Sequence, residues 1–148
     1  MKPIKTLVLL ADDAKARLFT NTGPGKGLVE IEDLSASILA ETKVRYSDRP
    51  GRSTAAPGIG RHAFDQAEAE HDQAQEAFAQ AVLGETTARF REGKFDRFIM
   101  VAAPSTLGVL RAHLPADLES ALTLDVPKNY VKLDPAEVVD RLSDAIVL

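Results

Sequence analysis

The 148-residue sequence contains no cysteine and no tryptophan, and only 5% of its residues are aromatic. The absence of cysteine excludes disulfides, a thiol nucleophile and thiolate metal ligands. No apolar run approaches the roughly 20 residues that cross a bilayer, so we expect no membrane association. The net charge of −4 argues against binding nucleic acid over the whole surface. The length, with 45% hydrophobic and 27% charged residues, predicts one globular domain over residues 1–148, and the order of elements given below predicts the α/β class.

The N-terminal residues 1–13 also lack the features of a signal peptide. They carry a basic residue, Lys2, near the start, but their apolar stretch is short and runs directly into Asp12 and Asp13. We therefore interpret Ile4–Ala11 as a first buried strand, with Asp12-Asp13 as the turn that follows it. This interpretation predicts a cytoplasmic protein.

The most informative apolar run is Phe95–Ala103, which lies between Gly93 and Pro104. A short run without alternation is typical of a strand that helices cover on both faces. Proline is tolerated where such a strand passes into a helix, and Ser105 is a candidate N-cap. The leucines that follow recur at helical spacing and predict a helix packed back on the sheet: Leu107, Leu110 and Leu114.

Periodicity and turn residues predict the other elements. Three strands form an antiparallel meander at 4–11, 15–21 and 28–34, with Val29 and Ile31 on the apolar face of the third. A long helix runs from Asp65 to about Arg91, a strand covers 120–126, and a last helix begins at Asp134-Pro135. The expected buried stripes are Ala74, Phe78, Ala81 and Val82 in the long helix, and Val138, Leu142, Ala145 and Ile146 in the last one. The order βββ-α-β-α-β-α predicts a mixed five-stranded sheet with helices on its faces, similar to that of ribonuclease H.

Residues 41–62 form an irregular basic loop in this prediction. Between Lys43 and His62, five basic residues face Asp48 alone, a net charge of +4, so the rest of the chain carries −8. Irregular loops of this length are usually functional or disordered. Arginine donates paired hydrogen bonds to phosphate, and glycine lets the backbone come close to a ligand. The candidate nucleic-acid-binding residues are Arg45, Arg49, Arg52, Gly58, Gly60, Arg61 and His62.

Four segments together resemble the bacterial family of proteins required for attachment to host cells: ADDAKARLF, GRHAF, FDRFIMVAAPSTLGVLRAHL and VPKNYVKLDPAEVVDRL. The resemblance covers nearly the whole chain, and Ala103–Arg111 is its most specific part. That family is similar in turn to the central domain of archaeal and eukaryotic peptide-release factors, which carries a Gly-Gly-Gln loop between its third strand and its long helix. Here the corresponding place holds Gly58-Ile59-Gly60-Arg61-His62 without glutamine. The resemblance therefore implies a release-factor-like fold and a loop able to approach RNA, but not peptidyl-tRNA hydrolysis by that motif.

Other chemistry has weaker support in the sequence. Asp12 and Asp13 invite comparison with the acidic site of two-metal nucleases, which needs several carboxylates at one point. Asp96 and Asp125 are expected at opposite ends of their strands, and a turn explains Asp12-Asp13 better. The three histidines show no metal-binding spacing, and Ser105 lies in no nucleophile motif. We assign no catalytic residue, metal or cofactor.

The leading hypothesis is a non-enzymatic, cytoplasmic member of the host-attachment family that associates with RNA, tRNA or the ribosome. In this hypothesis Arg49, Arg52 and Arg61 contact phosphate, and His62 caps or orients the long helix. A protein-interaction module for attachment or surface regulation is the alternative, and a metal-dependent nuclease is a third.

Overall fold

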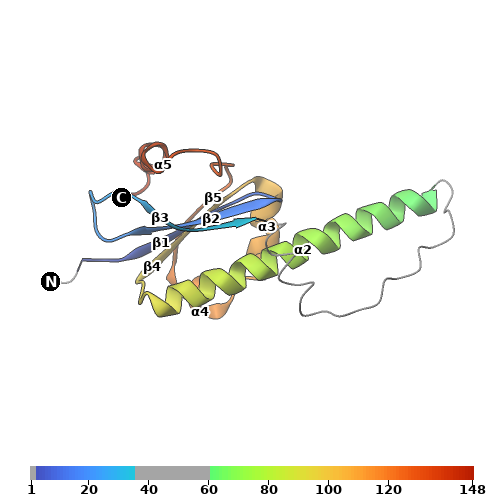
Figure 1. Cartoon of the computed structure of the whole chain (residues 1–148), viewed down its shortest axis with the longest axis horizontal. Helices are drawn as coiled ribbons and strands as arrows, with labels where there is room; N and C mark the ends of the chain where they lie inside the picture. Colours follow the sequence, from blue (N-terminus) through green and yellow to red (C-terminus); the bar gives the residue numbers. More distant parts are fainter. Residues whose placement is uncertain (1–2, 36–60) are drawn as a thin grey trace.

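A computed structural model describes residues 3–35 and 61–148, without the side chains of 61–66 and 68 (Figure 1). Its core is one mixed sheet of five strands in the order β3-β2-β1-β4-β5. The strands are β1 (Thr6–Ala11), β2 (Lys15–Asn21), β3 (Val29–Ser35), β4 (Arg97–Ala102) and β5 (Leu122–Val126). This arrangement confirms the predicted mixed sheet. No helix in the described ranges has the length and hydropathy needed to cross a membrane.

The length of each connection explains the direction of the strands. β1 and β2 pair antiparallel across a tight turn, and β2 pairs antiparallel with β3. β1 and β4 are parallel, as are β4 and β5, because helices occupy the connections that lead into β4 and β5. β1 is therefore the strand at which the sheet changes from antiparallel to parallel pairing.

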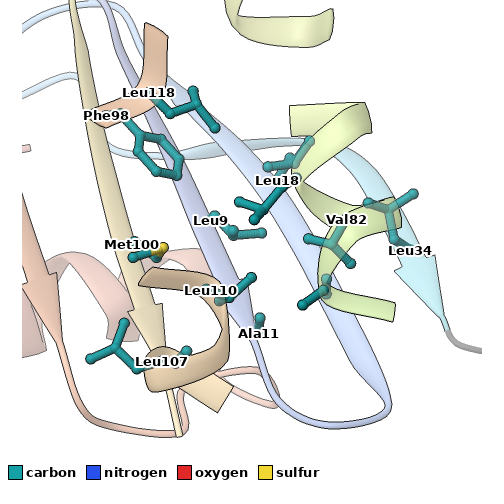
Figure 2. Packing of buried hydrophobic residues seen from close by; sticks show 14 of the residues in the cluster. Leu9, Ala11, Leu18, Leu34, Val82, Phe98, Met100, Leu107, Leu110 and Leu118 are labelled. Atoms are coloured by element: carbon teal, nitrogen blue, oxygen red, sulfur yellow. The ribbon is translucent and has the colours of Figure 1, made fainter. Parts of the chain in front are cut away.

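Helices cover both faces of the sheet. α2 (Arg61–Glu92), α3 (Pro104–Ala112) and α4 (Ala116–Ala121) lie on one face, and α5 (Pro135–Leu142) lies on the other (Figure 1). Alternate residues of β1 serve the two layers: Leu7 and Leu9 pack toward the first three helices, and Val8 and Leu10 toward α5. Figure 2 shows the first layer, where Leu9, Leu18, Phe98, Met100, Val82, Leu110 and Leu118 meet. Burial on both faces explains the unbroken apolar runs of β1 and β4.

The third strand differs from its prediction. Val29 and Ile31 are 62% and 42% exposed, although both were expected on a covered face. β3 is an edge strand, and its register with β2 shifts between Leu18 and Phe19, which leaves Ile31 outside the paired register. Leu34 is the residue of this strand that reaches the core.

Two predicted helices and one predicted strand also have different boundaries in the structure. α3 begins at Pro104 with Ala103 as its N-cap, so Ser105 is inside the helix; proline is favoured at the first helical position. Ser120 belongs to the short helix α4, and β5 starts only at Leu122. α5 ends at Leu142, which leaves Ala145 exposed beyond the helix.

Candidate nucleic-acid interface

The first half of α2 extends beyond the sheet as an arm, which we define as residues 61–77 (Figure 1). Phe78 is the first residue of the helix buried in the core. The described arm side chains are exposed, apart from Gln75 and Ala77, which are half-buried. Ala74, which was predicted to lie in the buried stripe, is one of the exposed residues. At 1.5 Å per residue the arm is about 25 Å long, so it holds its N-terminus well away from the body.

The second half of α2 is fixed to the body. Phe78, Ala79, Val82 and Leu83 are buried against the sheet. The Thr86 hydroxyl donates a hydrogen bond to the Val82 carbonyl at 2.7 Å, so this buried polar group has a partner. The anchored half thus gives the arm a rigid base.

Two arginines near the end of α2 add polar contacts to this base. Arg89 Nε donates to Glu32 Oε2 of β3 at 2.8 Å, and its other nitrogens reach Glu32 and Glu92. The hydrogen bond with Glu32 raises the pKa of Arg89 above its ordinary value. Arg91 Nε donates to Asp117 Oδ2 of α4 at 2.6 Å. The Arg89 contact joins the end of α2 to β3, the strand that precedes residues 36–60, and the Arg91 contact joins it to α4.

The predicted binding residues have the following positions. Arg61 and His62 form the first two positions of α2, at the free end of the arm, and the structure describes their backbone only. The helix therefore begins four residues before the predicted Asp65 and takes in the end of the predicted loop. The other predicted residues lie outside the described ranges: Arg45, Arg49, Arg52, Gly58 and Gly60. Their role in binding stays a prediction.

The acidic residues considered for a nuclease site do not meet. Asp12 Oδ1 accepts hydrogen bonds from the amides of Ala14 and Lys15 at 2.9 and 2.7 Å, which confirms the predicted turn. Asp96 Oδ2 accepts from the Lys5 amide at 2.9 Å, and Asp125 pairs with Arg111 at 2.6 Å. Asp12, Asp96 and Asp125 thus each have a separate partner.

Titratable side chains are also dispersed elsewhere in the part of the chain that the structure describes. There, no group of three or more His, Asp or Glu residues could hold a metal ion. His71 is exposed on the arm, and His113 Nδ1 lies 3.4 Å from Gln80 Nε2. His71 thus faces solvent and His113 lies near another helix, and the two histidines do not form a common site.

Arg17 is a structurally important residue that the sequence did not single out. Its Nη1 donates to the carbonyls of Val131 and Leu133 at 2.7 and 2.8 Å, and its Nε and Nη2 donate to Glu30. The hydrogen bond from Arg17 lowers the pKa of Glu30. The carbonyls that Arg17 binds are backbone groups 114 and 116 residues away, so no side-chain pattern could have indicated the contact.

One comparison with a solved structure supports the fold. The archaeal translation termination factor aRF1 superposes with a TM-score of 0.51 at 12% identity, over 95% of this chain and 38% of the factor. This chain therefore spans well under half the length of that factor. A Ppx/GppA phosphatase from Aquifex aeolicus gives a TM-score of 0.43 at 16% identity, over 84% of this chain and 36% of the phosphatase. No curated protein sequence matches this chain.

The sequence itself matches a family model over most of its length. That family is described as bacterial archaeo-eukaryotic release factor family 12, and the match covers residues 5–142. It extends from before β1 to the end of α5 and thus includes every described strand and helix. The release-factor part of the predicted resemblance is confirmed, and the chain belongs to bacterial archaeo-eukaryotic release factor family 12.

Proposed function

We propose that this protein is a non-enzymatic factor that associates with the ribosome or with tRNA and contacts RNA phosphate through residues 43–62. The observation that supports the proposal most is the arm of α2. The arm is about 25 Å long, and Arg61 and His62, the last residues of the basic segment, lie at its free N-terminal end. Family membership supports a role connected with translation. A positively charged segment suits a large anionic surface that an acidic body would otherwise repel.

The chemistry of the proposed contact follows from the residue types. Arg45, Arg49, Arg52 and Arg61 would donate paired hydrogen bonds to phosphate oxygens. Gly58 and Gly60 would allow close approach of the backbone, and the free amides at the start of α2 would favour an anion nearby. His62, the second residue of the helix, would orient that end.

The host-attachment role and the protein-interaction alternative stay predictions, as does the cytoplasmic location. The matching family description refers to release factors and gives no support to host attachment. A role in attachment would then be indirect, through an effect on translation.

The experiment that tests the proposal is co-sedimentation with purified ribosomes across a salt series. The test variant combines Arg49→Glu, Arg52→Glu and Arg61→Glu. The matched control combines Lys26→Glu, Lys128→Glu and Lys132→Glu, which makes the same change in net charge at three exposed lysines of the body. We expect wild type and control to sediment with ribosomes at low salt and the test variant to stay in solution. Equal sedimentation of all three proteins would contradict the proposal.

A further inference from the structure

The side of the arm is acidic, in contrast to the basic segment that it follows. Residues 63–77 contain no lysine or arginine but five carboxylates: Asp65, Glu68, Glu70, Asp72 and Glu76. Glu70, Asp72 and Glu76 are exposed, and none of the three pairs with a cation within the part of the chain that the structure describes. Their charge is therefore free to repel an anion.

Four of these five positions follow the line along α2 that is buried further on in the helix. Intervals of three and four residues connect Asp65, Glu68, Asp72 and Glu76, and the same spacing leads on to Ala79 and Leu83. Ala79 and Leu83 are buried against the sheet. The arm therefore has carboxylates where the anchored half of α2 has apolar side chains. Because a carboxylate is costly to bury, Asp72 and Glu76 keep this face of the arm in solvent.

The acidic surface continues from the arm onto the body. Asp12 and Asp13, at the carboxyl end of β1, line a small hollow at the base of the arm together with Gln75 and Phe78. Asp13 is exposed, and no lysine or arginine among the described residues pairs with it. RNA that lay along the arm would therefore meet carboxylates from Glu70 down to the body.

Distance decides which RNA contacts these carboxylates oppose. At 1.5 Å per residue, Glu70, Asp72 and Glu76 lie about 14, 17 and 23 Å along the helix axis from Arg61. The Debye length is about 8 Å at physiological ionic strength, so all three charges are largely screened from a phosphate bound at the free end of the arm. A phosphate beside the arm lies within that length and is repelled. The charge pattern thus favours RNA at the free end and disfavours RNA along the side.

We propose that Glu70, Asp72 and Glu76 are specificity-determining residues that confine RNA to the free end of the arm, an inference that rests on the RNA contact proposed above. One Debye length on either side of that end spans about 16 Å, which holds about five consecutive phosphates at the roughly 3.4 Å spacing of one duplex strand. The preferred RNA therefore presents a short run of phosphates, as a loop or a strand end does. RNA that has to lie along the arm is rejected.

The test is fluorescence anisotropy of the full-length chain with two labelled single-stranded RNAs, a uridine hexanucleotide and a uridine 24-mer. The arm variant combines Glu70→Gln, Asp72→Asn and Glu76→Gln. We expect this variant to bind the 24-mer at least about threefold more tightly than wild type does, because the longer strand is then free to lie along the arm. Its affinity for the hexanucleotide should be unchanged, since that strand is held at the free end alone.

The matched control makes the same change in net charge at three exposed carboxylates of the body: Glu119→Gln, Asp140→Asn and Asp144→Asn. It should leave the ratio of the two affinities as in wild type. The 24-mer offers every variant the same number of binding positions, so a change in this ratio reports the arm. Unchanged hexanucleotide affinity also shows that the arm variant is folded. An equal gain for both RNAs, no gain for the 24-mer, or the same gain in the control would overturn the inference.

The outcomes distinguish this inference from the RNA contact on which it rests. Binding of both RNAs by wild type and its loss in the triple arginine variant would support the contact, whatever the arm variant does. If the arm variant then shows no gain that depends on RNA length, only the confinement of RNA to the free end is overturned. If wild type binds neither RNA at low salt, the contact itself is wrong and the inference is overturned with it.

Discussion

Arg89 of α2 and Glu32 of β3 lie 2.8 Å apart, between Arg89 Nε and Glu32 Oε2, although 57 residues separate them in the sequence. Residues 36–60 lie within that interval, so the contact joins the strand before the basic segment to the helix after it. The arginine side chain is 40% exposed and that of Glu32 is 20% exposed. The pair fixes the last turns of α2, in the half of the helix that anchors the arm.

This relationship predicts a local effect of Arg89→Ala. The variant should lower the urea midpoint of unfolding only slightly, because partly exposed ion pairs contribute little to stability. Hydrogen exchange should nevertheless become faster at the amides of the last turns of α2, and it should stay unchanged in β1 and β4. Equal acceleration throughout the sheet would show that the pair has a global rather than a local role.

Replacement of Arg17 should cost more. Arg17→Ala removes the donor to the carbonyls of Val131 and Leu133 and leaves Glu30 without its partner. We expect the free energy of unfolding to fall by about 2–3 kcal/mol. Urea denaturation measures this loss, with Lys15→Ala, at an exposed position of the same strand, as the control. A loss no greater than that of the control would contradict the assigned role.

The lowered pKa of Glu30 predicts how stability depends on pH. A carboxyl whose pKa is lower in the folded than in the unfolded state stabilises the fold fully above its unfolded pKa, and this contribution is lost as the pH falls through the folded pKa. Wild type should therefore exceed Glu30→Gln in stability at pH 7, and the difference should shrink as the solution is acidified below about pH 4.3. Urea denaturation between pH 7 and pH 3 measures the difference. A gap that is constant or grows on acidification would contradict this account.

One substitution in the core and one at the exposed edge strand form a matched pair. Leu118→Ala removes a fully buried side chain from the layer beneath α2 and α3 and should cost about 2–5 kcal/mol. Val29→Ala, at the exposed edge strand, should change stability by less than about 0.5 kcal/mol. Thermal or urea unfolding of both variants tests whether the edge strand is as exposed as the structure shows.

The same two residues show what the sequence could and could not reveal. Unbroken apolar runs identified β1 and β4. Because both faces of these strands are buried, the apolar composition of each run is enough to predict a strand. Val29 was misplaced because alternation does not reveal that a strand lies at an edge or that its register shifts. Leu118 was missed as a core residue because α4 has only six residues, too few for a helical period to emerge.

The candidate site was harder to predict from the sequence than the fold. The charge contrast of residues 43–62 could be counted, but the arm could not be foreseen. Its exposed alanines, such as Ala74, have the same spacing as the buried residues further along α2.

The central claim is that Arg49, Arg52 and Arg61 contact RNA phosphate. The most direct measurement is the binding constant for fluorescent tRNA as a function of salt, for wild type and for the combined variant Arg49→Gln, Arg52→Gln and Arg61→Gln. If each arginine neutralises one phosphate, the slope of log K against log salt should become shallower by about 2 in the variant. A slope equal to that of wild type would contradict the claim, as would the same change after Lys26→Gln, Lys128→Gln and Lys132→Gln.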